Sequence, residues 1–218
     1  MKRSTQRWVH VVLSAAVSLA TFAAFAAPSL AANNLILPRS GQVGFGFSGG
    51  YGTLLPAGEL GNEFGGGPSL AVRMRYRMRF ERAIGLSFEA ERMNSRDVSN
   101  QPGAFDTLTD FPTVSRDRMK MVTAGFDFYQ MFDTRERTVK YLSIGAGLAQ
   151  ISAHLTDGET QFPIAGDGVF VALGGGFERF FFKSWAWDFG TRYKAVFHDG
   201  KVNHDIQLSL GMMFYAAY

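Results

Sequence analysis

Two His-Asp pairs near the C-terminal end are the residues of this sequence best suited to chemistry. They are His198-Asp199 and His204-Asp205, six positions apart. A histidine can act as general base for a serine nucleophile, and histidines with carboxylates can bind a metal ion. A hydrolase needs the serine within hydrogen-bond reach of that base, and adjacent residues of a strand point to opposite faces. We therefore predict polar loop histidines, with a transient metal site at these four residues as the weaker alternative.

A row of arginines in residues 72–80, VRMRYRMRF, is the second chemical feature. In a β-strand, Arg73, Arg75, Arg77 and Arg79 share one face, and the apolar residues between them share the other. The apolar face suits an oily environment. The arginine face needs acidic partners, because an unpaired buried charge is very costly.

Charged residues of other segments can supply those partners. Pairing across a turn at residues 81–83, with apolar opposite apolar, places Arg75 opposite Glu89 and Arg73 opposite Glu91. The predicted interior network has six cations and five anions: Arg73, Arg75, Arg77, Arg79, Glu89, Glu91, Asp127, Glu178, Asp188, Arg192 and Lys194. Such a network could be an ion path or gate, or a salt-bridged plug. The interior of an eight-stranded barrel is just wide enough for its side chains, which favours the plug.

Eight segments with a period of two would position these residues. From residue 41 onward, apolar side chains alternate with polar or small ones. Because the period of two is that of β-strands, the segments predict an all-β fold. Their even number, eight, predicts an antiparallel up-and-down barrel of eight strands. The predicted strands are 41–51, 68–80, 84–93, 118–131, 139–151, 168–178, 185–197 and 204–218.

The predicted connections indicate a transmembrane barrel. Long segments 52–67, 94–117 and 152–167 gather at one end, and tight turns lie at the other, as in outer-membrane barrels. A soluble barrel with an apolar interior would show the same period with its faces reversed.

Glycines on the non-apolar face decide between the two kinds of barrel. Inside a narrow barrel, small residues make room for long ones, whereas a solvated strand surface has no need of them. These glycines are Gly85, Gly125, Gly145, Gly147, Gly174, Gly176, Gly190 and Gly211. We therefore predict that the apolar face contacts lipid. The predicted aromatic belt at the short-turn end is Phe80, Phe128, Trp185, Trp187 and Tyr218.

The first residues predict export. Residues 1–7 carry three basic side chains and no acid, residues 8–27 are almost wholly apolar, and small residues precede residue 32. We expect a signal peptide over residues 1–31 and a barrel domain over 32–218, with a retained anchor helix as the alternative. Cleavage would leave 19 basic and 19 acidic residues, so the charge does not predict a nucleic-acid partner. There is no cysteine for a disulfide or thiolate metal site.

The mature chain resembles the small eight-stranded outer-membrane barrels of the OmpA/OmpX type. The resemblance rests on the signal, the eight amphipathic strands, the alternating connections and a last strand, 205–218, that ends on an aromatic residue. It implies the outer membrane of a Gram-negative bacterium, with both termini periplasmic. It also implies contact with outer-membrane lipids and lipopolysaccharide, and recognition of the C-terminal strand by the barrel assembly machinery.

The function expected from this resemblance is envelope structure and surface interaction, with ligands at loops 52–67, 94–117 and 152–167. A narrow passive channel for ions or small hydrophobic solutes is the alternative, and a lipid-modifying enzyme is the third possibility. Lipid A deacylase barrels carry a serine two residues after their histidine, whereas Gly200 and Ile206 occupy those positions here. We therefore expect no catalytic activity, no cofactor and no nucleic-acid partner.

Overall fold

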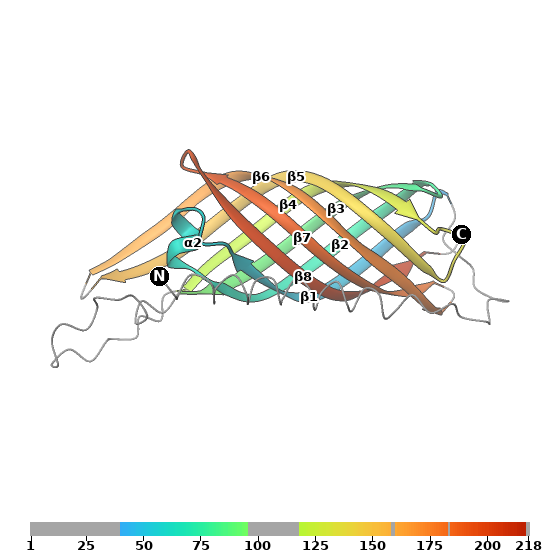
Figure 1. Ribbon diagram of the computed structural model, residues 1–218, viewed down its shortest axis with the longest axis horizontal. Coiled ribbons are helices and arrows are strands. Elements are labelled where there is room, and N and C mark those ends of the chain that lie inside the picture. Colours follow the sequence, from blue (N-terminus) through green and yellow to red (C-terminus); the bar gives the residue numbers. More distant parts are fainter. Residues whose placement is uncertain (1–39, 96–117, 158–159, 183, 217–218) are drawn as a thin grey trace, which may run out of the picture. The chain divides into compact units, whose positions relative to one another are not determined.

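The computed structural model describes residues 40–95, 118–157, 160–182 and 184–216. Eight antiparallel strands follow one another around a closed barrel, and the last strand pairs with the first (Figure 1). The predicted all-β, up-and-down, eight-stranded barrel is confirmed. The strands are β1 (Val43–Leu54), β2 (Gly66–Arg79), β3 (Arg82–Asn94), β4 (Arg118–Phe132), β5 (Thr138–Asp157), β6 (Thr160–Phe182), β7 (Trp185–His198) and β8 (Lys201–Tyr215). One short helix, α2 (Glu59–Glu63), lies between β1 and β2.

The two faces of the barrel wall have opposite character. Outward side chains are large, apolar and exposed, with Phe47 at 61% and Leu148 at 67% of full exposure. Inward side chains include arginines, of which Arg75 is 1% and Arg77 0% exposed. The arrangement is that of a barrel in lipid, and it excludes the alternative with an apolar interior. In the described part of the chain, no helix has the length and apolar character needed to cross a membrane.

The connections divide the barrel into two ends. Short connections at 80–81 and 133–137 lie at one end, here called the turn end, where β6 also ends and β7 begins. The α2 segment, the turn at 199–200, the last residues of β3 and β5 and the first residues of β4 and β6 lie at the other end, here called the loop end (Figure 1).

One of the three predicted loops is wrong, because 152–167 is mostly strand. β5 and β6 stay paired as far as Asp157 opposite Thr160, and they form a hairpin that reaches beyond α2 in Figure 1. Predicted loop 52–67 shrinks to 55–65 and contains α2. Predicted loop 94–117 lies outside the described residues apart from its first two positions. Hairpin pairing needs only backbone hydrogen bonds, so the strands continue where the side-chain alternation stops.

The predicted register between the second and third strands is also wrong. Val72 pairs with Phe88, so Arg75 faces Gly85 and Arg73 faces Ser87. The turn is two residues long, at 80–81, and a bulge follows Arg77. Registers that differ by an even number of residues keep apolar opposite apolar, so periodicity alone cannot choose between them.

Glycines on the inner wall make room for larger side chains, as the sequence predicted, and these include aromatic residues that the sequence analysis did not place there. A Cβ atom at Gly125 would lie 2.6 Å from the Phe170 ring and 3.1 Å from the carbonyl oxygen of Ala146. A Cβ atom at Gly176 would lie 2.7 Å from the hydroxyl of Tyr141. Phe170 and Tyr141 therefore depend on glycines in nearby strands.

We expect Gly125→Ala to destabilise the barrel by about 1–3 kcal/mol, because the added methyl group overpacks the Phe170 site. Urea unfolding of the protein in lipid vesicles measures this loss. Gly49→Ala is the matched control, since its Cβ atom would come no closer than 3.9 Å to Leu70. Equal effects of the two substitutions would contradict the packing argument.

Candidate functional site

Glu178 of β6 is the centre of a buried ionic cluster near the turn end of the lumen. Its carboxylate accepts hydrogen bonds from Arg75 and from Arg77, the latter with Nη2 3.0 Å from Oε2. Tyr215 of β8 donates its hydroxyl to the same carboxylate, at 2.6 Å from Oε1 and 2.8 Å from Oε2. Two guanidinium groups therefore share one counter-ion in a site that is almost fully buried.

Tyrosine rings enclose the guanidinium group of Arg75. Its Cζ atom lies 4.0 Å from the ring centroid of Tyr129 and 4.9 Å from that of Tyr141. Attraction between a cation and an aromatic ring is strongest when the cation is desolvated, as here. Tyr141 also donates a 2.8 Å hydrogen bond to Oδ1 of Asp188, so it links this cluster to a second carboxylate.

Lys194 of β7 is the centre of a second cluster, nearer the loop end. Its Nζ atom lies 3.1 Å from Oε2 of Glu89 and 3.3 Å from Oδ2 of Asp205, and it also contacts Glu91. All four side chains are at most 1% exposed. One ammonium group is therefore surrounded by three carboxylates from β3 and β8.

Two arginines connect the clusters. Arg192 Nη2 lies 2.7 Å from Oδ1 of Asp127, and its Nη1 lies 3.2 Å from Oε1 of Glu89. Arg73 lies 3.3 Å from Glu89 through Nη2 and 3.7 Å from Asp188 through Nη1. The ionic network therefore runs continuously from β8 at the loop end to the Asp188 region near the turn end.

The membership of this network differs from the predicted one at two positions. Ten of the eleven predicted residues are buried, but Arg79 is exposed. The bulge after Arg77 changes the alternation of β2, which moves Arg79 off the inner face. Asp205 joins instead, so the described lumen holds five cations and six carboxylates.

The predicted partners of the arginines are wrong as well. Arg75 contacts Glu178 rather than Glu89, and Arg73 contacts Glu89 and Asp188 rather than Glu91. These pairs span the lumen or run diagonally along the wall. A long arginine side chain can reach such positions, so the residue directly opposite on the next strand need not be its partner.

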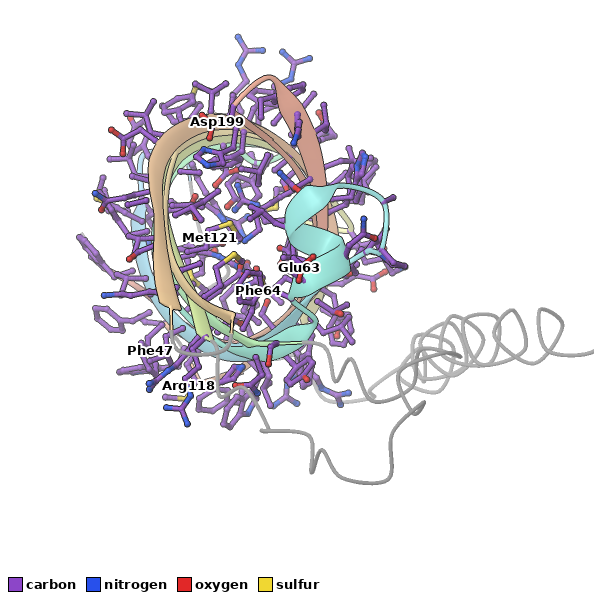
Figure 2. All side chains as sticks on the ribbon, turned by 90° about the vertical axis from the view of Figure 1, so that its left-hand side faces the viewer. Phe47, Glu63, Phe64, Arg118, Met121 and Asp199 are labelled. Carbon is purple, nitrogen blue, oxygen red and sulfur yellow. The ribbon has the colours of Figure 1, made fainter. Side chains whose placement is uncertain are left out.

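Apolar side chains close the lumen on both sides of the network. Near the loop end, one cluster includes Leu60 of α2 and Phe64, which follows it; its members are Leu54, Leu60, Phe64, Met93, Met119, Met121, Ala149, Ile151, Ala153, Phe170, Ala172 and Val196. Figure 2 shows Phe64 and Met121 inside the ring of strands and Phe47 outside it. The cluster at the turn end is Ala83, Tyr129, Met131, Val139, Tyr141, Phe180, Ala186, Met213 and Tyr215.

One void between the lumen side chains is very small. A void beside Arg73, Tyr129, Tyr141 and Arg192 has about 10 Å³, which is near the minimum for a single water molecule. Packed charges and packed apolar residues therefore succeed one another along the lumen. This arrangement is chemically suited to a plug.

The predicted aromatic belt lies on the outer wall at the turn end. Phe80, Phe128, Trp185 and Trp187 are exposed there, whereas Tyr218 lies outside the described residues. Trp185 packs against Phe214, and Trp187 against Phe181, with ring centroids 4.9 and 5.5 Å apart. Further aromatic residues thus extend the predicted belt.

The two His-Asp pairs do not converge. His204 stacks on Tyr193 on the outer wall, and the two residues share a 2.5 Å hydrogen bond. His198 is buried and lies 3.3 Å from Asp199, while Asp205 points into the lumen toward Lys194. Among the described residues, no group of three or more histidine or acidic side chains is placed to bind a metal ion.

Four important lumen residues were absent from the predicted network: Tyr129, Tyr141, Asp205 and Tyr215. The signal that could have found them is the alternation itself. Each is buried between two more exposed neighbours of its strand, as Asp205 is between His204 and Ile206. An aromatic residue in a membrane strand is easily assigned to the lipid face, although position in the alternation decides its direction.

Comparison with known proteins supports the fold and goes no further. No protein-family model and no curated protein matches the sequence. Among solved structures, Neisserial surface protein A is 15% identical, with a TM-score of 0.56, covering 79% of this chain and 96% of that one. The outer membrane protein OprG from Pseudomonas aeruginosa is 11% identical, with a TM-score of 0.54, covering 85% and 100%. Ail, the attachment invasion locus protein of Yersinia pestis, is 13% identical, with a TM-score of 0.50, covering 81% and 100%. The chain thus has the fold of small eight-stranded outer-membrane barrels.

Proposed function

We propose that this protein is an integral outer-membrane barrel with a plugged lumen, which serves the structure of the envelope and contacts ligands at its loop end. The observation that carries the proposal is the combination of an apolar outer wall with an ion-paired, aromatic-lined interior. Such a wall is stable in hydrocarbon because every strand is paired and the barrel has no open edge. In this proposal the barrel anchors the loop end, where ligands are contacted, in the membrane.

The fold neighbours support an outer-membrane location, and the strands have suitable lengths. A tilted membrane-spanning strand needs about nine to eleven residues. The shortest strand, β1, has 12 residues. In this proposal, residues 1–31 are the cleaved signal, the turn end and both termini are periplasmic, and β8, which closes the barrel on β1, is recognised by the assembly machinery.

The loop end supports the surface role. β5 has 20 residues and β6 has 23, so their hairpin is much longer than a membrane crossing requires. The α2 segment lies at the same end, with its Leu60 and Phe64 packed into the lumen and Glu63 exposed. The backbone of the hairpin, together with the exposed side of α2, forms the proposed ligand surface. In this proposal the protein is not an enzyme.

The plug predicts that purified protein gives no stable conductance in planar lipid bilayers. Protein recovered from outer-membrane fractions, with different gel mobility before and after boiling, is reconstituted and recorded over a range of voltages. In this proposal the packed network between Lys194 and Glu178 leaves no room for a continuous column of water. A 16-stranded porin serves as the positive control, since barrels of that size leave an aqueous channel.

Steady and reproducible channels from the wild-type protein would replace the plug with the channel alternative. Recovery as a soluble periplasmic protein would refute the membrane proposal itself. Fractionation tests the membrane location and the bilayer recording tests the plug, so each result can be interpreted without the other.

A further inference from the structure

Three basic side chains lie together on the outer wall near the loop end. They are Arg92 of β3 with Arg118 and Lys120 of β4, here called the basic triad, and all three are exposed. Arg92 is the cross-strand partner of Lys120, and Arg118 is two residues from Lys120 on the same face. Figure 2 shows Arg118 on the outside of the barrel, at the loop end. Neighbouring positions of this kind place side chains about 5–7 Å apart.

The described part of this wall offers the basic triad no acidic partner. Among the described side chains of β2–β5, the acidic residues are Glu89, Glu91 and Asp127, and all three are buried in the lumen network. Like charges directly opposite on adjacent strands destabilise a sheet. An anion bound between Arg92 and Lys120 would relieve this repulsion.

An apolar groove adjoins the basic triad. It has a volume of about 560 Å³ and is lined by Pro68 and Leu70 of β2, Ala90 of β3, Met119 of β4 and Ser152 of β5, together with the three basic residues and Glu91. Pro68, Leu70 and Ala90 are exposed on the outer wall. The groove therefore continues the apolar surface of the barrel up to the level of the positive charges.

We propose that the basic triad and this groove form a binding site for a phosphorylated, acylated lipid of the surrounding leaflet. The triad holds the phosphate, the Ser152 hydroxyl is a further donor, and an acyl chain lies over Leu70 and Ala90. Charge complementarity selects the headgroup, because arginine forms charge-assisted and often bidentate hydrogen bonds with phosphate. The site rests on the proposed membrane location, and it gives the lipid contact a defined place on the wall.

The test compares lipid binding by two triple variants of the full-length barrel in detergent. The triad variant is Arg92→Gln, Arg118→Gln and Lys120→Gln. The control variant, Arg79→Gln, Arg82→Gln and Arg179→Gln, removes the same charge from the turn end. Native mass spectrometry measures retention of bis-phosphorylated lipid A, with dephosphorylated lipid A and inorganic phosphate as further probes.

We expect the triad variant to lose about a hundredfold in affinity for lipid A, from about 1 kcal/mol for each basic residue near an anionic surface. The control variant should bind like the wild type. Equal losses in both variants would refute the site, as would equal binding of dephosphorylated lipid A. Inorganic phosphate that displaces lipid A at similar concentration would show a free-anion site instead of a lipid site.

Insertion into phosphatidylcholine vesicles is measured for the same three proteins by the change of gel mobility on boiling. A barrel that inserts but does not retain lipid A refutes this inference and leaves the proposed function in place. A wild-type protein that fails to insert refutes both.

Discussion

Glu178→Gln should lower the free energy of unfolding of the barrel by about 3–5 kcal/mol, the usual cost of leaving a buried charge without its partner. The substitution keeps the shape of the side chain and removes its charge. Arg75 and Arg77 would then face each other's positive charge in a site where both are at most 1% exposed. Urea unfolding of the barrel in vesicles, followed by tryptophan fluorescence and gel mobility, measures the loss.

A rescue variant separates the lost ion pair from a general disturbance of packing. Glu178→Gln combined with Arg75→Met and Arg77→Met removes all three charges, and it should recover much of the stability because no buried charge remains unpaired. Glu63→Gln, on the exposed side of α2, is the control and should change little. A loss below about 1 kcal/mol for Glu178→Gln would mean that another group neutralises the two arginines.

The sequence predicts the barrel well because the period of a strand is a local property. Alternation in residues 72–80 orients Arg73, Arg75 and Arg77 correctly without any knowledge of the rest of the chain. The same reasoning fails at Arg79, because a bulge adds one residue and reverses the faces beyond it. No residue type in the stretch marks that bulge.

The ion pairs could not be predicted because their partners come from across the lumen. Arg75 and Glu178 are 103 residues apart in sequence, and their contact depends on which strands face each other in the closed barrel. Charge balance indicates that partners exist, while the register and the reach of each side chain decide which they are. The predicted register between β2 and β3 was wrong because a three-residue turn, and a two-residue turn combined with the bulge after Arg77, both keep apolar residues opposite apolar ones.

Lys194→Met should also lower the free energy of unfolding by about 3–5 kcal/mol. Glu178→Gln removes a buried anion, whereas Lys194→Met removes a buried cation. Here one cation serves three carboxylates, so its removal leaves an excess of negative charge. Glu89 keeps Arg73 and Arg192 at 3.3 and 3.2 Å. The cost should therefore fall on Glu91 and Asp205, for which the described structure shows no other ion pair.

This difference among the three carboxylates makes the rescue specific. Adding Glu91→Gln and Asp205→Asn to Lys194→Met should restore most of the stability, whereas adding Glu89→Gln alone should lower it further, since Arg73 and Arg192 would lose a shared partner. Lys140→Met is the matched control, because Lys140 is exposed and its 2.8 Å pair with Asp133 is solvated, so its loss should be small. Urea midpoints of the five proteins in vesicles decide the order. A rescue by Glu89→Gln equal to that by Glu91→Gln with Asp205→Asn would contradict this expectation. Lys194 would then be paired chiefly with Glu89, and the network would be centred on a single ion pair instead of a shared ammonium group.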